Sequence, residues 1–457
     1  MVACGGSSTP PTNVVMSPPV LDAGPPADHI AKSSLARDPA SGIASTSLDA
    51  AVAANNAFAL DLYAQLAKAS GASKANLFTS PISASLALTM TYAGAKGTTA
   101  TQMASALHIA DASTIFDGQN ALSQALASRA ATAFAGAQQV ASANGGAPPS
   151  TEDYQLEVIN SVWGEQTYTW ESPFLDVLAR SYGTGVYQED FENNPDSARN
   201  TINAWVGTQT GGKITNLLPG SAIDSATRLA LVNAIHLRFP WATPFQTWDT
   251  APATFTTAAG TTVTSPVMNR IDGYSYVDDG QAQTLALPLA GNETAMLVTL
   301  PHGDLAAYEA ALTVGSPAIT IPSATSSVAL ALPTFAFASP TFSLKDALGA
   351  MGMTQAFDSS KASFAGLCAN PSDGRTLYIA DVLQKTVIGV QESGVEASGA
   401  TAVIVSSDGG IDFEAGAPPT PIPMIVNKPF LVSIVDRPTG AVLFLGHVED
   451  PTNAGTP

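Results

Sequence analysis

The stretch Gly207–Ile214 is the part of the sequence whose residue types and spacing come closest to a ligand-binding motif. It reads GTQTGGKI, which nearly matches a phosphate-binding loop, but the Ser or Thr that should follow the lysine is missing. Its glycines also follow a helical pattern instead of a strand, so we expect Gly211 and Gly212 to end a helix. The stretch therefore does not predict nucleotide binding.

Motifs for other catalytic reactions are absent from the sequence. It has no G-x-S-x-G, H-E-x-x-H or Cys-x-x-Cys pattern. Cys368 has no histidine nearby in sequence and is predicted to be a free thiol. The histidines lack the spacing of metal ligands, and each is predicted to be a surface or hydrogen-bonded core residue: His29, His108, His236, His302 and His447. We therefore expect no enzyme activity, no metal ion and no cofactor.

Cys4 is the remaining residue at which chemistry is expected. It is one of 2 cysteines, a number that excludes a disulfide framework. The sequence MVACGGSS resembles the end of a bacterial lipoprotein signal, although the charged and apolar parts of such a signal do not precede it. Cys4 is therefore a candidate for lipid attachment, and the alternative is a chance cysteine in a disordered N-terminus. We expect an extracellular or cell-envelope protein.

Charge and composition exclude several classes of partner. The 457 residues include 18 basic and 37 acidic ones, which gives a net charge of −19 without a basic cluster. Nucleic acid and heparin-like polyanions are therefore not expected to bind. A hydrophobic content of 45% is enough for a large core, and the sequence has no apolar run long enough to cross a membrane.

Four polar residues stand in apolar strand or helix contexts and are candidates for a buried site. They are Ser80, Ser83, Asn233 and Gln384. Because buried polar groups need hydrogen-bond partners, such residues often share one network. The alternative is that each of them caps a local element.

The segment from Glu392 to Asn427 begins as a strand and ends as a loop. If Glu396 faces solvent, strand alternation places an uncharged set on the other face: Val395, Ala397, Gly399, Thr401, Val403 and Val405. These residues are small enough to enter a sheet that has already formed. The following SSDGGIDFEAGAPP is rich in Gly and Pro, which predicts an exposed tip that proteases can cut.

The remaining pattern predicts both helices and strands, and length alone would allow two or three domains. Residues 1–48 are read as a disordered Pro/Ser/Ala-rich tether. The Ala-rich residues 123–150 predict a helix followed by a poorly ordered insertion. Residues 377–394 predict one long strand, and Arg437–Gly440 predicts the turn of a final hairpin.

Five motifs in order make the chain resemble a bacterial member of the serpin family over about residues 48–452. The motifs are NLFTSPIS, INAWVGTQTGGKITNLL, LVNAIHLRFPWATPF, ESGVEASGATAVIV, and NKPFLVSIV followed by TGAVLFLGHV. The resemblance implies an α+β fold in one domain, residues 49–452, followed by a tail of residues 453–457. This fold would have three β-sheets, about nine helices and an exposed reactive-centre loop.

The resemblance also implies roles for particular residues. Ser80, Ser83 and Asn233 match the polar cluster called the shutter, Gln384 stands where the family commonly has His, and Trp241 matches the aromatic where loop insertion begins. Thr334 replaces a Lys that pairs with the first hinge residue in some relatives. The hinge would consist of Glu392, Gly394, Val395, Glu396, Ala397, Ser398, Gly399, Ala400 and Thr401.

As a serpin, the chain would be a suicide-substrate inhibitor that forms a covalent 1:1 complex with a serine protease or, less commonly, a cysteine protease. It would act as a monomer. Counting from Glu392 places the scissile bond at Asp408–Gly409, with Phe413 and Glu414 as alternatives. A non-inhibitory serpin, acting as a binding or structural module, is the second reading.

Overall fold

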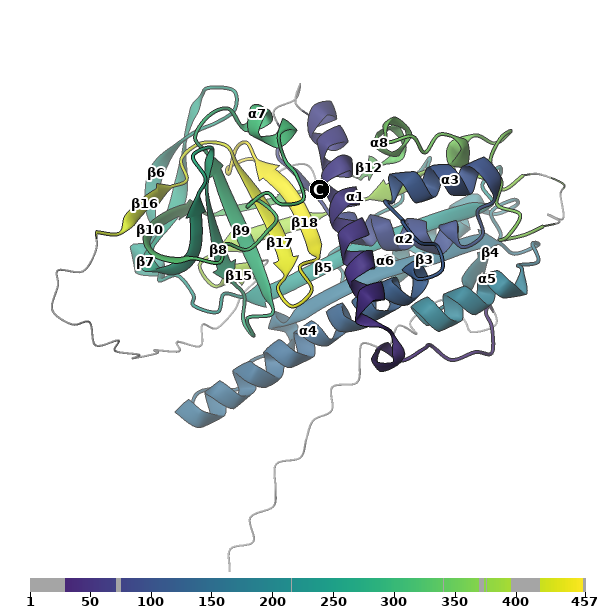
Figure 1. Ribbon diagram of the computed structural model, residues 1–457, viewed down its shortest axis with the longest axis horizontal. Helices are drawn as coiled ribbons and strands as arrows, with labels where there is room; N and C mark the ends of the chain where they lie inside the picture. The colour runs from purple at the N-terminus through teal and green to yellow at the C-terminus, as the bar shows by residue number, and fades with distance from the viewer. Residues whose placement is uncertain are drawn as a thin grey trace, which may run out of the picture.

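The computed structural model describes residues 29–70, 75–214, 216–339, 341–369, 374, 376–395 and 420–454, and all structural statements below concern these residues. They form an α+β fold with two large sheets (Figure 1). The helices are α1 (Ser45–Ser70), α2 (Pro81–Tyr92), α3 (Gly97–Ala106), α4 (Ile115–Asn144), α5 (Ser172–Val177), α6 (Pro195–Gln209), α7 (Leu305–Ala310) and α8 (Lys345–Ala350).

The first sheet has the strand order β1-β4-β3-β5-β15-β14-β11, with β13 paired to β5 and β12 paired to β13. Its central strand β5 reads LALVNAIHLRFP and is buried along nearly all its length, as expected for a strand covered on both faces. The strands are β1 (Ile30–Ala31), β3 (Gln155–Glu165), β4 (Val186–Glu189), β5 (Leu229–Pro240), β11 (Phe335–Ala338), β12 (Phe342–Ser343), β13 (Val382–Gln384), β14 (Val387–Gln391) and β15 (Gly394–Val395).

The second sheet has the order β16-β10-β7-β8-β9-β17-β18-β2, with β6 paired to β7. The 17-residue β7 pairs with β6 and β10 along one part and with β8 at its end, so it joins what the sequence predicts as two sheets. The strands are β2 (Leu77–Thr79), β6 (Ala251–Thr256), β7 (Thr262–Asp278), β8 (Ala282–Pro288), β9 (Thr294–Pro301), β10 (Thr325–Pro333), β16 (Ile422–Ile425), β17 (Phe430–Asp436) and β18 (Val442–Val448).

Two helices hold the first sheet from opposite faces. Helix α2 starts with proline, which is favourable in a first helical turn, and all but its last residue are buried. It contacts β3, β5 and β18, so it joins the two sheets. Helix α6 packs on the other face through Trp205, which lies 5.6 Å from both Trp163 and Tyr187, ring centroid to centroid.

The alanine-rich segment is more helical than the sequence pattern predicts. Helix α4 continues to Asn144 and ends at Gly145, whose φ of 64° is in the left-handed region that glycine favours at helix ends. Alanine has the highest intrinsic helix propensity, which supports this length although few residues beyond Phe134 are buried. The end of α4 projects from the body of the molecule (Figure 1).

Residues 29–44 correct the prediction of a disordered tether, because they pack on the domain. Strand β1 pairs with β4, and Asp38 pairs with Arg180 at 2.9 Å. The Arg37 guanidinium donates to Asn120 Oδ1 at 2.9 Å. These contacts are polar and long-range, so a search for apolar periodicity could not find them.

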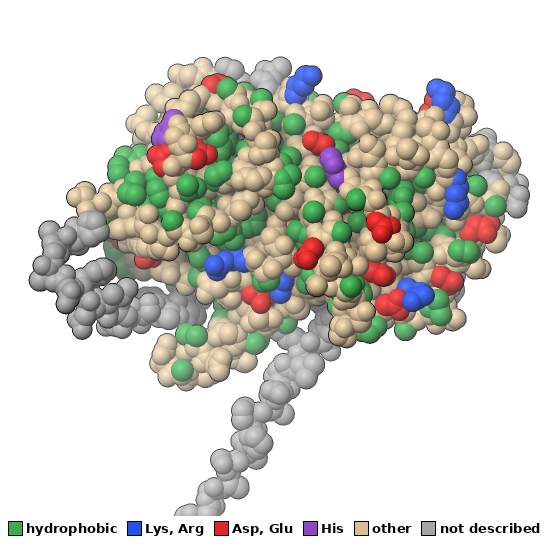
Figure 2. All heavy atoms as spheres, in the orientation of Figure 1, with side chains coloured by type: hydrophobic (Ala, Val, Ile, Leu, Met, Phe, Trp, Pro, Cys, Tyr) green, Lys and Arg blue, Asp and Glu red, His purple; other side chains and the backbone are tan. Residues whose placement is uncertain are grey.

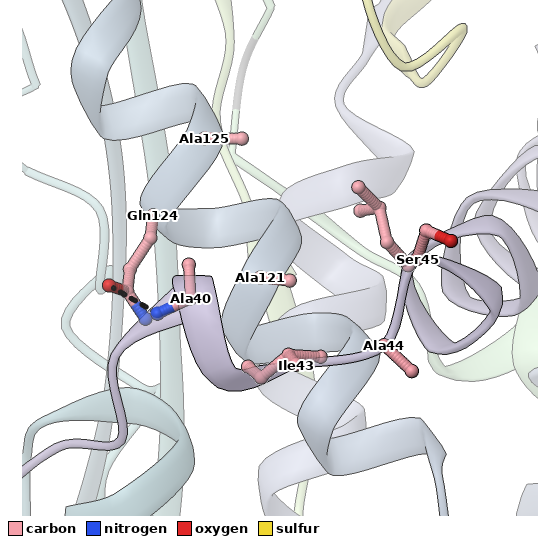
Figure 3. A pocket seen from close by; sticks show the side chains of 8 residues that line it. Ala40, Ile43, Ala44, Ser45, Ala121, Gln124 and Ala125 are labelled. Atoms are coloured by element: carbon pink, nitrogen blue, oxygen red, sulfur yellow. Dashed lines mark hydrogen bonds between the residues drawn. The ribbon is translucent and has the colours of Figure 1, made fainter.

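A shallow pocket of about 460 Å³ lies between this N-terminal segment and α4 (Figure 3). It is lined mainly by alanine and aliphatic side chains, and its one amide, Gln124, accepts a hydrogen bond from the Ala40 N–H at 3.3 Å. No charged side chain lines it, so it offers no group for catalysis.

Two predictions near the C-terminus have different outcomes. The final hairpin is confirmed: β17 and β18 pair antiparallel, and Gly440 in the turn has φ 75°. The single long strand predicted over residues 377–394 is wrong, because it divides into β13 and β14 around Thr386. The Thr386 hydroxyl donates to Phe78 O at 2.7 Å, which fixes the break between the two strands.

Candidate functional site

The site is organised around the two-residue strand β15, which lies between β5 and β14. Val395 is opposite Phe239 on one side and Val390 on the other, and both pairings are antiparallel. A turn of two residues, 392 and 393, connects β14 to β15. After its last strand on this side, the chain therefore turns back into the interior of its own sheet.

Gly394 and Val395 suit this position for different reasons. A Cβ at Gly394 would lie 2.3 Å from Phe239 O, so the close approach to β5 requires glycine. The Val395 side chain is 2% exposed and belongs to the core shared with the second sheet. Burial of an aliphatic side chain stabilises by about 1.5–3 kcal/mol, which favours the inserted position of β15.

Trp241, the residue that follows β5, holds the turn between β14 and β15. Its indole Nε1–H donates to Gln391 O at 2.8 Å, and its backbone N–H donates to Ser393 O at 3.0 Å. The indole is buried and stands edge-on to Phe245, 6.1 Å away between ring centroids. The aromatic expected at this end of the sheet is thus bonded to the residues that precede β15.

Glu392 is held by uncharged donors. The Phe245 N–H donates to Glu392 O at 2.9 Å, and the Thr250 hydroxyl donates to the Glu392 carboxylate at 2.8 Å. Thr334, which stands where some relatives have a Lys, instead bonds Pro266 O through its backbone N–H at 2.9 Å. The carboxylate therefore has a hydroxyl partner in place of the ammonium ion.

The strands β5 and β14 leave a gap between them, which β15 fills at one end. The opposite end of this gap is closed by direct strand pairing. Strand β13 pairs parallel with β5, with Val382 opposite Leu231 and Leu383 opposite Val232. Strands β5 and β14 are thus separated by β15 at one end, while β13 closes on β5 at the other. A longer insertion along β5 would have to break this pairing.

Gln384 is the centre of a buried polar network beside the closed end. Its Oε1 accepts from the Thr79 hydroxyl at 2.6 Å and from the Ser80 N–H at 3.0 Å. Its Nε2 donates to Ser80 O at 2.9 Å and to Asn233 Oδ1 at 3.3 Å. The amide uses both its donor and its acceptor capacity, so it joins three segments of the chain.

Asn233 and Ser83 extend the network in different directions. Asn233 Nδ2 donates to Leu383 O at 3.3 Å, which ties β5 to β13. The Ser83 hydroxyl donates to Asn160 Oδ1 at 3.3 Å, and Asn160 is the cross-strand neighbour of Asn233. The structure therefore brings Ser80, Asn233 and Gln384 into direct contact, whereas Ser83 bonds to Asn160.

Sequence reasoning missed Thr79, Asn160 and Thr386. Thr79 could have been found because it precedes Ser80 in a short strand. The role of Asn160 depends on the register of β3 against β5, and that of Thr386 on its bond to Phe78. Neither relation is visible in the sequence.

A buried cluster of titratable groups with raised pKa values lies away from this site. His447 Nδ1 is 2.6 Å from a Glu309 carboxylate oxygen, which also accepts from the Tyr63 hydroxyl at 2.5 Å. Burial alone lowers the pKa of His447, but the hydrogen bond and negative charge of Glu309 outweigh it, so the pKa is raised. Burial, followed by the Glu309 charge, raises the pKa of Tyr63.

Several predicted residues lie outside the described part of the chain. They are Cys4, the later hinge residues Glu396, Ala397, Ser398, Gly399, Ala400 and Thr401, and the scissile-bond candidates Asp408, Gly409, Phe413 and Glu414. Cys368 is buried in the core beside α3 and α8 residues. The described residues contain no cluster of three or more His, Cys, Asp or Glu that could hold a metal ion. No helix in that same part is both long and apolar enough to span a membrane.

The fold and site define a class of protein in which the chain that follows a sheet strand turns back between two strands of its own sheet. The family model "Serpin (serine protease inhibitor)" matches residues 53–451. An uncharacterised serpin-like protein of Thermococcus kodakarensis is 32% identical over 402 residues, covering 88% of this chain and 85% of the relative. Human Serpin B4 is 32% identical over 404 residues, covering 87% and 98%.

Solved structures of serpins are also similar to this chain. The native state of the thermophilic serpin tengpin matches with a TM-score of 0.72 and 26% identity, covering 93% of this chain and 98% of tengpin. Native protease nexin-1 with heparin matches with a TM-score of 0.71 and 26% identity, covering 89% and 100%. The chain belongs to the serpin family, a family of serine protease inhibitors.

Proposed function

We propose that the protein is a suicide-substrate inhibitor that traps a serine protease by inserting its own cleaved loop. The observation that carries this proposal is β15, which already pairs with both β5 and β14. The protease serine attacks the loop between Val395 and β16 and forms an acyl-enzyme with the residue before the scissile bond. The freed N-terminal part of the loop then continues β15 down the sheet.

The geometry of the first sheet supports this path. Because β15 runs antiparallel to β5, its continuation would pass the β5 residues that precede Phe239 and reach Asn233. There it meets the bond from Asn233 to Leu383 and the pairing of β13 with β5. Insertion must therefore open the Gln384 network, which holds the sheet closed through side-chain hydrogen bonds.

Strand insertion supplies enough free energy to deform a protease. A dozen or so ladder hydrogen bonds at about 1 kcal/mol each, with several buried aliphatic side chains, give on the order of 20 kcal/mol. Global protein stability is typically about 5–15 kcal/mol. The uncleaved protein must then be a kinetically trapped state.

The proposed partner set follows from the same mechanism. We propose a covalent 1:1 complex of a monomeric inhibitor with a serine or cysteine protease outside the cell or in its envelope. Heparin-like activation is not expected, because the one basic residue of α4, Arg129, is paired with Asp436 at 2.7 Å. The basic side chains in Figure 2 are scattered and form no patch on that face.

A protease panel tests the proposal. The full chain is mixed with chymotrypsin-like, elastase-like, glutamyl-specific and subtilisin-like proteases, and denaturing gels are examined for a complex that survives boiling. Sequencing of the released C-terminal fragment distinguishes cleavage at Asp408–Gly409 from cleavage at Phe413 or Glu414. Loop cleavage by these proteases without any stable complex would support the non-inhibitory binding or structural module instead.

A further inference from the structure

Exposed apolar side chains gather at one end of the second sheet. Seven large hydrophobic residues are exposed in the described part of the chain, and four of them come from the short helical turn η5 (Thr247–Asp249), β7 and β16. They are Trp248, Ile271, Ile422 and Ile425. Trp248 is 74% exposed, Ile271 65% and Ile425 56%, which is unusual for such large apolar side chains.

Strand register places Ile271, Pro423 and Ile425 on one face of this sheet, whereas Ile422 lies opposite the buried Val328 and is on the other face. In the β16-β10-β7 part of the sheet, Ala329 of β10 lies between Ile271 and Pro423. Ala331, which is two positions further along β10, lies opposite Ile425. The β10 residues between and beside these alanines are buried on the other side. Trp248, Ile271, Ala329, Ala331, Pro423 and Ile425 form what we call the apolar face.

Trp248 connects the apolar face to the start of the reactive loop. It lies between Phe245 and Thr250, which both donate hydrogen bonds to Glu392. The carbonyl of the next residue, Asp249, accepts from Asn269 Nδ2 of β7 at 2.8 Å. The backbone that carries the exposed indole is therefore fixed between the hinge and β7.

The other end of the loop also adjoins this face. The loop starts after Val395 and ends at β16, whose Pro423 and Ile425 belong to the face. Figure 1 places β16, β10 and β7 together at one end of the molecule, with β15 nearby. Both attachment points of the loop therefore lie near the apolar face, so a protease that holds the loop is tethered beside it.

A second copy of the chain is a poor occupant by strand addition, because within the open edge of β16 only the Ile425 N–H faces outward as a donor. Val426 N–H donates to Ala331 O at 2.9 Å, so the N–H positions of residues 421 and 423 face away from β10. Both residues are prolines, which have no N–H. Strand addition at this edge is therefore disfavoured, and a partner must bind through side chains on the face.

We propose that the apolar face is a secondary docking surface for the target protease, used while its active site holds the loop. This rests on the proposed inhibitory function. The matching protease surface would carry an exposed apolar side chain with basic neighbours beside its active-site cleft. Basic neighbours are inferred because the exposed Asp249 directly follows Trp248 and the chain has a net charge of −19.

The test compares rates of trapping by matched variants of the full chain. Trp248→Ala combined with Ile271→Ser removes the centre of the face, while Val140→Ser combined with Val314→Ser removes two exposed valines elsewhere. Every protease of the panel that forms the boiling-resistant complex is used as the probe. Because an aromatic at an interface centre contributes strongly, the first variant should trap at least one of them about tenfold more slowly.

The remaining measurements separate the possible outcomes. The docking variant should keep its thermal unfolding midpoint and its ratio of inhibitor consumed to protease trapped, since it leaves the loop and sheet unchanged. Rates equal to those of the parent toward every trapped protease would overturn the docking proposal while leaving inhibition intact. Faster trapping would also overturn it, because it would show that the face restrains the loop. Absence of any complex with the parent chain would overturn the proposed function itself.

Discussion

The two ends of the gap in the first sheet are held in different ways. At the hinge end, β15 is bound by backbone hydrogen bonds and by one buried aliphatic side chain, Val395. At the closed end, β13 pairs with β5 through the backbone, and the amides of Gln384 and Asn233 add a network of side-chain hydrogen bonds. Backbone pairing can be extended one residue at a time, whereas an amide network must be broken and rebuilt. If the loop inserts as proposed, this difference places the barrier to insertion at the closed end.

Among the proposed substitutions, Val395→Arg should have the largest effect on protease trapping, and it acts at the hinge end. An arginine at a position that is 2% exposed, among apolar side chains, would bury an unpaired charge, so β15 should leave the sheet. Trapping should then be lost and the loop should be cut as an ordinary substrate, as seen on denaturing gels. Val395→Thr is the matched control and should still trap. Efficient trapping by the arginine variant would show that β15 does not lead insertion.

Gln384→Ala should weaken the closed end. It leaves the Thr79 hydroxyl and the Ser80 N–H without their acceptor and removes the bond to Asn233, which should destabilise the native state by about 2–4 kcal/mol. A lower thermal unfolding midpoint and faster spontaneous loss of inhibitory activity are expected. Gln384→Glu keeps the shape of the side chain but replaces the Nε2 donor with an oxygen, so it tests whether that donor matters. An unchanged thermal unfolding midpoint in the alanine variant would show that the network does not stabilise the closed sheet.

Trp241→Phe should affect the hinge end by a smaller amount. The ring can still pack near Phe245, but the Nε1–H bond to Gln391 O is lost, at a cost of about 1 kcal/mol. Hydrogen exchange should speed up at the amides of β15 and remain unchanged in β13. Equal acceleration at both ends would contradict the separation of the two regions.

A pH titration gives the smallest and most gradual effect, and it separates the Gln384 network from a titrating cluster. The raised pKa of His447 means that its pairing with Glu309 stabilises the fold fully below its unfolded pKa of about 6.5. This contribution is lost as the pH rises through the higher folded pKa, so the unfolding midpoint should fall over that window. Glu309→Gln should abolish the decline. The Gln384 amide has no proton to lose there, so Gln384→Ala should keep the slope.

Local patterns in the sequence predicted part of the site. Ser83 and Asn233 were expected in apolar helix or strand contexts, and they lie in α2 and β5, because buried elements carry continuous apolar runs. The isolated polar residues in these elements pointed to a network. Where the prediction was too simple, a contact between distant segments decided the outcome: Thr386 with Phe78 in the strand break, and Arg37 with Asn120 in the N-terminal segment.

The sequence alone determined that the chain is an acidic α+β protein, that it resembles serpins, and that small uncharged residues follow Glu392. Those properties depend on residue types and on short-range order. Only the tertiary structure decided that Gly394 and Val395 already occupy the sheet, that Gln384 meets Ser80 and Asn233, and that Trp248 stands beside the hinge. Strand register and long-range packing set these relations, because a polar or apolar side chain acquires its role only from the groups that the fold places against it.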